Sequence, residues 1–402
     1  LLGPVSALSF LGTCAFSPPS PLANLPGGPL FAAGYELLYR VTKDYPKPAF
    51  DIDRVTAAGT EVSVVEQLVM QKPFCRLLHF KRSSSDVAAS EALGRAPIVL
   101  VVAPLSGHHA TLLRDTVHTL LADHDVYVTD WINARLVPLE RGPFTLDDYV
   151  DYVRDFIRHI GAERVHVVSV CQPCVPVLGA AALLAAAGEP TPKSLILIGG
   201  PVDARRHPTQ VNDLATTHSR AWFEEHLIQE VPSMYPGRGR RVYPGFLQHA
   251  GFIAMNPGRH MSSHWDFFRH LVDGDDEDAE AHRRFYDEYN AVIDLAAEYY
   301  LDCVRIVFQD FLLPRGKWYV HDQRVAPELL RDTALLTIEG ERDDISGVGQ
   351  TQAAQELCSG IPPERKRHLL VENVGHYGLF SGRRWRTLVY PRIAEFIGSQ
   401  SR

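Results

Sequence analysis

The residue best placed for nucleophilic chemistry is Cys171. The segment 164–180 reads R-V-H-V-V-S-V-C-Q-P-C-V-P-V-L-G-A, so a β-branched strand runs into a turn and then into an Ala/Leu-rich helix. A thiol at a helix N-terminus lies at the positive end of the helix dipole, which favours the reactive thiolate. The sequence therefore predicts Cys171 as the nucleophile at a sharp strand-to-helix turn.

The residues around Cys171 fit such a turn. The compact Ser169 lies two positions before it, and Pro173 lies two positions after it, where a proline loses only an amide that the first helical turn leaves unbonded. The backbone N–H of Gln172 would face the oxyanion that forms when the sulfur attacks a carbonyl. We expect the second donor in the loop 103–110 after an earlier strand, at Ser106, with Leu105 as the next choice.

A carboxylate and a histidine follow the nucleophile in the order that a catalytic triad requires. The strand 334–339 runs into G-E-R-D-D-I-S, and the strand 367–372 runs into N-V-G-H-Y-G. Asp343 is the predicted acid, with Asp344 as the alternative. His376 is the predicted base, because it follows the last strand directly behind a glycine.

Two other interpretations of the cysteines stay open. C-Q-P-C (171–174) is also a C-x-x-C at a helix start, as in thioredoxin-like redox proteins. Cys174 is the second candidate nucleophile, although it lies one helical turn further in. The same proximity predicts that oxidation joins Cys171 and Cys174 in an inhibitory disulfide.

The remaining pattern predicts an α/β-hydrolase fold, with a mostly parallel central sheet flanked by helices. Two strands are expected within 61–80, around a turn near 72–73. Short apolar runs follow at 98–103, 126–129, 165–170, 195–198, 334–339 and 367–372. Helix signals lie between them: a capping-box-like start at Thr145, a segment from Ser346 to Gly360, and a last helix at 389–397.

The gap between the strands at 198 and 334 is too long for a loop. We therefore expect a core of residues 33–200 and 333–402, a mainly helical cap subdomain inserted at 201–332, and a Pro-rich, uncharged segment at 1–32. The insert holds 18 of the 38 aromatic residues. They either form its own core or bind an apolar substrate. The candidate substrate-binding aromatics are Trp318, Tyr319 and Trp131.

Composition excludes several classes of function. A formal net charge of −8 argues against non-specific nucleic-acid binding, and six cysteines in 402 residues make no disulfide scaffold. After the apolar N-terminal stretch, no later apolar run reaches the length of a membrane span, so we expect a soluble protein. The first 35 residues carry no Lys, Arg, Asp or Glu, and the chain begins at Leu1, as expected of a processed or truncated product.

Four segments resemble the intracellular-type polyhydroxyalkanoate depolymerases that use a catalytic cysteine. They are A-P-L-S-G-H-H-A-T-L-L-R (103–114), V-Y-V-T-D-W-I-N-A-R-L-V-P (126–138), V-C-Q-P-C-V-P-V-L (170–178) and E-G-E-R-D-D-I-S-G-V-G-Q-T (339–351). The resemblance runs from about residue 33 to the C-terminus. It implies Cys171 as nucleophile, Asp343 as acid and His376 as base.

The resemblance also implies a substrate and a place in the cell. The substrate would be amorphous short-chain polyester, cleaved to 3-hydroxybutyrate oligomers or monomer without metal or cofactor. The enzyme would be cytoplasmic and associated with polymer granules, whereas the uncharged N-terminus leaves export as the alternative. A synthase-like acyltransferase that shares the cysteine turn, or a non-catalytic granule-binding protein, are the other functions that the sequence leaves open.

Overall fold

A computed structural model describes residues 3–43, 45–255 and 257–400. Residues 1 and 2 of the predicted N-terminal segment lie outside the described residues. The chain forms two compact units: residues 1–48 with 246–292, and residues 49–245 with 293–402. The predicted insert 201–332 therefore contributes residues to both units, and its role as a cap stays a prediction.

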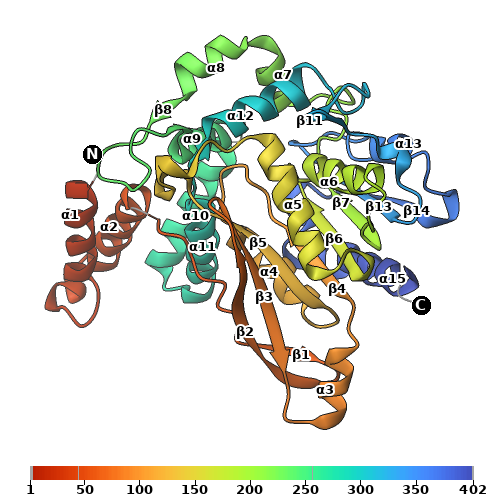
Figure 1. The fold of residues 1–402 in the computed structure, drawn as a ribbon. Coiled ribbons are helices and arrows are strands. Elements are labelled where there is room, and N and C mark those ends of the chain that lie inside the picture. Colours follow the sequence, from red (N-terminus) through yellow and green to blue (C-terminus); the bar gives the residue numbers. More distant parts are fainter. Residues whose placement is uncertain (1–2, 44, 256, 401–402) are drawn as a thin grey trace. The chain divides into compact units, whose positions relative to one another are not determined.

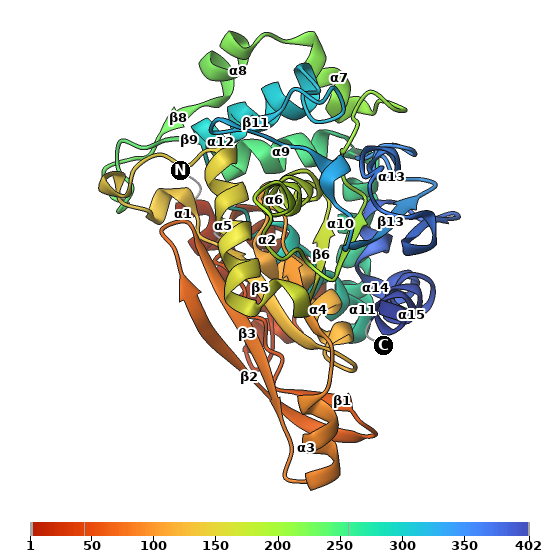
Figure 2. The same cartoon turned by 45° about the vertical axis from the view of Figure 1, so that its right-hand side comes forward.

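The larger unit is built on a nine-stranded sheet (Figures 1 and 2). Its order is β1-β2-β3-β5-β4-β6-β7-β13-β14. The strands are β1 (Arg54–Ala57), β2 (Thr60–Gln71), β3 (Cys75–Ser83), β4 (Ile98–Val102), β5 (Asp125–Trp131), β6 (Val165–Val170), β7 (Ser194–Ile198), β13 (Ala334–Gly340) and β14 (Lys366–Val371). The strands β1, β2 and β3 are antiparallel to their neighbours. The other six strands of this sheet, from β5 across to β14 in the order above, run parallel to one another. The protein thus has the expected α/β-hydrolase architecture.

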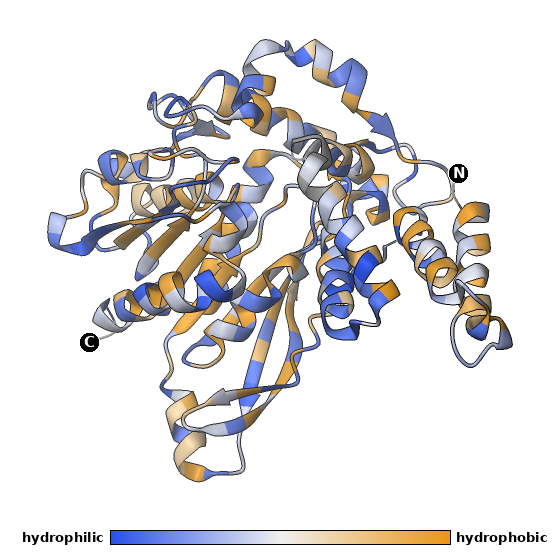
Figure 3. Cartoon of the chain, turned by 180° about the vertical axis from the view of Figure 1, so that it is seen from behind, coloured by the Kyte–Doolittle hydropathy of each residue, from blue (hydrophilic) through white to orange (hydrophobic). Residues whose placement is uncertain are grey.

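The continuous apolar runs are explained by burial on both faces of the sheet. Every residue of β6, β7 and β13 is buried, and Figure 3 shows these central strands as predominantly hydrophobic. Helices α5 (Leu146–Ile160) and α6 (Cys174–Ala186) lie on one face, and α4 (Arg114–Leu120) and α15 (Tyr390–Gln400) lie on the other (Figures 1 and 2). The edge strand β14 is half exposed, with only Val371 buried.

The helix start predicted at Thr145 is confirmed. The Thr145 hydroxyl accepts a hydrogen bond from the Asp148 amide, and the Asp148 carboxylate accepts one from the Thr145 amide, which completes a capping box for α5. The apolar side of α5 is buried at Tyr149, Val153 and Phe156. The last helix also lies close to its predicted place, with a π-helical turn at Trp385–Val389 leading into α15.

The helix predicted from Ser346 to Gly360 is wrong in extent. Only α13 (Ala353–Leu357) is helical there. The amides that would begin the helix bond to side chains instead: Asp343 accepts from Ile345 and Ser346, and the carboxylate of Glu339 accepts from three amides between 349 and 352. These bonds hold the segment 343–352 as a series of turns.

The smaller unit is helical. It contains α1 (Gly3–Phe16), α2 (Gly28–Thr42), most of α9 (Gly245–Met255), α10 (Pro257–Asp273) and α11 (Asp276–Tyr289). The prolines of the N-terminal segment lie in the first turn of α1 or α2, or between the two helices, where they break no helix. Within this unit Arg283 pairs with Glu36, and Arg40 pairs with Asp287. No helix among the described residues is both long and apolar enough to cross a membrane.

Candidate active site

Cys171 occupies the turn between β6 and α6 with a left-handed backbone. Its φ is 68°, a conformation that a non-glycine residue adopts at a cost in energy and that marks sharp nucleophile turns. The Cys171 amide donates to the carbonyl of Ile198 at 2.7 Å, and its carbonyl accepts from Cys174 at 3.1 Å. These bonds fix the turn, and the side chain stays partly exposed.

Two glycines after β7 allow this turn to pack closely. A Cβ atom on Gly200 would lie 2.3 Å from the Cβ of Cys174 and 2.6 Å from the carbonyl oxygen of Cys171. A Cβ on Gly199, whose φ is 56°, would lie 3.3 Å from both Asp343 Oδ2 and His376 Cε1. Gly199 and Gly200 therefore lie between the cysteine turn and the Asp343–His376 pair.

The structure brings the predicted acid and base together. His376 Nδ1 lies 2.7 Å from Asp343 Oδ2, and both residues are buried. The other carboxylate oxygen of Asp343 accepts from the amides of Ile345 and Ser346, each at 2.9 Å. Asp344, the alternative acid, is exposed. The carboxylate that contacts His376 is thus that of Asp343.

His376 also interacts with Cys171. Burial by itself lowers the pKa of the imidazole, but the charge of Asp343 and that of Cys171, with hydrogen bonds to both, raise the pKa of His376 well above its ordinary value. A histidine held in this way accepts a proton readily from a thiol on one side while the carboxylate fixes its orientation on the other. The Asp343–His376 pair thus lies beside the turn that carries Cys171.

The second cysteine of the turn has a different environment. Cys174 is fully buried in the first turn of α6, where its sulfur contacts the hydroxyl of Ser169 at 3.4 Å. Burial raises the pKa of the Cys174 thiol to about 12, so it stays protonated at neutral pH. Both cysteines are free.

The predicted oxyanion donors, Gln172 and Ser106, both lie outside helices and strands. The amides of Gln172 and Ser106 donate no hydrogen bond to any residue that the structure describes. The Tyr299 hydroxyl donates to the carbonyl of Leu105 at 3.0 Å. Burial raises the pKa of Tyr299 well above its ordinary value, and the charge of Cys303 is the next largest cause.

Tyr299 was not predicted from the sequence, since nothing distinguishes one tyrosine among the aromatics of the insert. The three aromatics proposed for substrate binding lie in different environments. Trp131 is buried, with its indole N–H bonded to the carbonyl of Ala103 at 2.8 Å. Trp318 is also fully buried and packs against Gly179. Tyr319 is 54% exposed.

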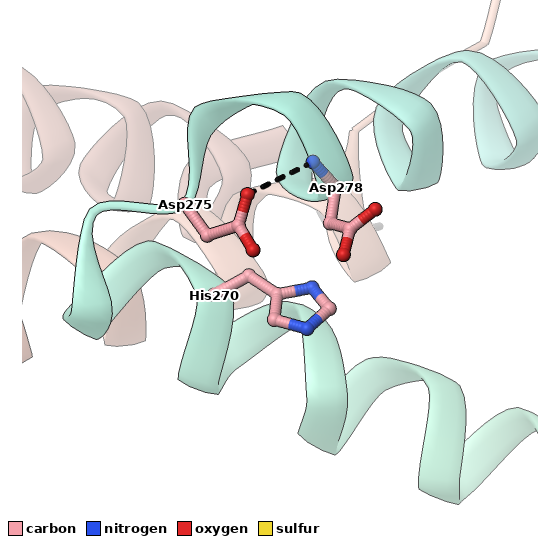
Figure 4. A group of neighbouring side chains, drawn as sticks. All are labelled: His270, Asp275 and Asp278. Atoms are coloured by element: carbon pink, nitrogen blue, oxygen red, sulfur yellow. Dashed lines mark hydrogen bonds between the residues drawn. The ribbon is translucent and has the colours of Figure 1, made fainter.

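One group of side chains has the composition of a metal site. His270, Asp275 and Asp278 place one ligand atom each within 4.8 Å of one another, and Figure 4 shows the ring of His270 beside both carboxylates. Asp275 is the N-cap of α11, where it accepts from the amide of Asp278, and both carboxylates are exposed. Helix capping accounts for the two acids without an ion.

Comparison with known families decides the assignment. The sequence model of the family described as PHB de-polymerase C-terminus matches residues 199–401, just over half of the chain. The chain belongs to this family. This PHB depolymerase family protein is therefore a carboxylic ester hydrolase, and the matched region contains the Asp343–His376 pair.

Solved structures similar to this PHB depolymerase family protein are distant. A putative lipase from Acinetobacter baumannii AYE is 11% identical, with a TM-score of 0.42 over 84% of this chain and 92% of the lipase. A 2-hydroxy-6-oxo-6-phenylhexa-2,4-dienoate hydrolase from Rhodococcus sp. strain RHA1 is 14% identical, with a TM-score of 0.46 over 84% and 99%. Similarity at this level does not bear on the function. A search of curated proteins found no match.

Proposed function

We propose that the protein hydrolyses ester bonds in poly(3-hydroxybutyrate), or a similar short-chain polyhydroxyalkanoate, through Cys171, His376 and Asp343. The observation that carries the proposal is the 2.7 Å contact between His376 and the buried Asp343, beside the glycines that pack against the strained Cys171 turn. Membership of the PHB depolymerase family supports the polyester as substrate.

In the first half of the reaction, His376 takes the proton of the Cys171 thiol, and the thiolate attacks the ester carbonyl carbon. The amides of Gln172 and Ser106 donate hydrogen bonds to the oxyanion, and each lowers the activation free energy by about 3 kcal/mol. The bond to the alcohol oxygen breaks, and the alcohol end of the polymer leaves with the proton from His376. The acyl end stays on the sulfur as a 3-hydroxyacyl thioester.

In the second half, His376 takes a proton from water, and the resulting hydroxide attacks the thioester carbonyl. The carbon–sulfur bond then breaks, the 3-hydroxy acid is released, and the thiol is restored. Asp343 keeps the imidazole in the correct tautomer and stabilises its positive charge in both halves. No step needs a metal or a cofactor.

The proposal extends to where the enzyme works. A water-insoluble polyester offers its bonds at a granule surface, so we place the activity on polymer granules in the cytoplasm. Membership of the PHB depolymerase family supports the granule as the physical substrate.

Turnover of amorphous poly(3-hydroxybutyrate) in water enriched in ¹⁸O tests the function. The proposal expects 3-hydroxybutyrate or its oligomers with ¹⁸O in the new carboxylate, and loss of turnover in Cys171→Ala. The Cys174→Ala variant is the matched control and should stay active. Acyl transfer to an alcohol without ¹⁸O would indicate a synthase-like enzyme. Granule binding without products would indicate a non-catalytic protein, and a requirement for both cysteines would indicate dithiol chemistry.

A further inference from the structure

Glu339 is a buried carboxylate with no part in the reaction described above. It is 1% exposed, near the end of β13. Its Oε1 atom accepts from the amides of Thr351 and Gln352 at 2.7 and 2.8 Å, and its Oε2 atom accepts from Gly349 at 2.8 Å. Three amides compensate a buried charge only when the chain around them is fixed, so Glu339 holds the segment that follows Asp343.

Thr351 links this segment to the glycines beside the nucleophile turn. Its hydroxyl donates to the Gly200 carbonyl at 2.9 Å and accepts from the Gly200 amide at 2.8 Å. Thr351 is fully buried, so no water takes over these bonds. The threonine thus satisfies both backbone groups of Gly200.

Gly199 and Gly200 transmit this restraint in two directions. Gly200 lies against the carbonyl of Cys171 and the side chain of Cys174, whereas Gly199 lies against Asp343 and His376. A shift of these glycines would therefore change the position of the nucleophile relative to its base. Misplacement by about 1 Å costs roughly a hundredfold in rate at a catalytic site.

We propose that Thr351 and Glu339 are positioning residues that fix Gly199 and Gly200, and thereby set the distance between the sulfur of Cys171 and the imidazole of His376. The inference rests on the proposed function, because it assigns their effect to the Cys171–His376 pair. Neither residue touches the substrate in this account.

The test compares Thr351→Val with Thr351→Ser in the full chain. Valine keeps the size and the backbone amide that bonds to Glu339 but removes the hydroxyl, whereas serine keeps the hydroxyl. We expect Thr351→Val to lower kcat about 10- to 100-fold with little change in KM. The pH dependence of Cys171 alkylation by iodoacetamide should shift in the valine variant, and serine should restore both quantities.

Thr337→Val is the matched structural control. Thr337 is a buried threonine on the same strand as Glu339, and its hydroxyl bonds to Gln355 and His368 rather than to the glycines. The Thr337→Val variant should be less stable than the wild type, with no shift in the pH dependence of Cys171 alkylation. If Thr351→Val does not fold, Glu339→Gln takes its place in the test. A glutamine side chain has one acceptor oxygen in place of two for the three backbone amides, so this variant should shift the pH dependence of Cys171 alkylation in the same direction.

The inference is overturned if Thr351→Val keeps the kcat and the alkylation profile of the wild type, or if Thr337→Val shifts the profile equally. These results differ from a failure of the proposed function, which would appear as full activity in Cys171→Ala. Alkylation reports on the thiol without any polymer, so the positioning role is tested whichever ester is the substrate.

Discussion

The Nδ1 atom of His376 lies 2.7 Å from the Oδ2 atom of Asp343, and a Cβ atom on Gly199 would lie 3.3 Å from the same carboxylate oxygen. Asp343 is therefore held by His376 on one side, by the backbone of Gly199 on another, and by two amides of its own turn. Such a carboxylate has little freedom to move away from the imidazole.

Asp343→Asn should lower kcat about 10³- to 10⁴-fold, because an amide no longer selects the productive tautomer of His376 or stabilises its charge. Steady-state hydrolysis of a soluble 3-hydroxybutyrate ester measures the change. Asp344→Asn is the matched control, since Asp344 is the exposed neighbour in the same turn, and it should retain near wild-type activity. Equal losses in both variants would contradict the assignment of the acid.

Iodoacetamide at neutral pH should label Cys171 and leave Cys174 unmodified. Cys171 is partly exposed at the turn before α6. Cys174 is fully buried, and burial raises its pKa to about 12. Peptide mapping by mass spectrometry measures both sites, with the exposed Cys14 as an internal reference. Faster labelling of Cys174 would contradict the structure.

The Cys171–Cys174 disulfide predicted from the sequence stays a prediction. Cys174 is fully buried, and its sulfur contacts the hydroxyl of Ser169. Peptide mapping after mild oxidation tests it. A peptide linking the two cysteines, with loss of activity that a reductant reverses, would support the disulfide, and its absence would rule it out.

The stability of the protein should decline on the alkaline side because of His376. The folded state raises the pKa of His376 well above its ordinary value of 6.5. The stabilisation is therefore complete below about pH 6.5 and is lost as the pH rises through the folded-state pKa. Urea unfolding across this range should give a free energy difference between wild type and His376→Gln that shrinks with pH. A constant difference would contradict the raised pKa.

Gly200→Ala should destabilise the protein by about 1–3 kcal/mol. The added Cβ would lie 2.3 Å from the Cβ of Cys174 and 2.6 Å from the Cys171 carbonyl, so the backbone must shift. Gly398→Ala is the control within α15, where the added Cβ meets no atom within 4 Å. It should stabilise the helix by up to about 1 kcal/mol. Urea unfolding compares the two, and a neutral Gly200→Ala would be inconsistent with the packing.

Much of the core could be predicted because its strands are buried on both faces. Continuous apolar runs such as 165–170 and 195–198 have no other simple interpretation between helical segments. The sites of Cys171, Asp343 and His376 could be chosen because each directly follows such a strand. The pattern places these residues at one edge of the sheet, where the structure brings them together.

Other parts could not be predicted because polar side chains override local signals. Ser346 has the features of a helix start, but the backbone amides that would begin the helix donate their hydrogen bonds to the carboxylates of Asp343 and Glu339. Nothing in the sequence marks Glu339 or Thr351. Their hydrogen bonds form only when distant parts of the chain meet in the fold, as between Thr351 and Gly200. Helices α1 and α2 were not predicted because the prolines of this segment suggested an irregular chain. These prolines lie in the first turn of either helix or between the two helices.

The most direct test of the central claim is to trap the covalent intermediate. The wild-type enzyme is mixed rapidly with a 3-hydroxybutyrate ester, quenched in acid and mapped by mass spectrometry. We expect a 3-hydroxybutyryl group on Cys171 that hydroxylamine releases, as it does a thioester, and that is absent from Cys171→Ala. An acyl group on Cys174 or on a serine, with full turnover by Cys171→Ala, would contradict it.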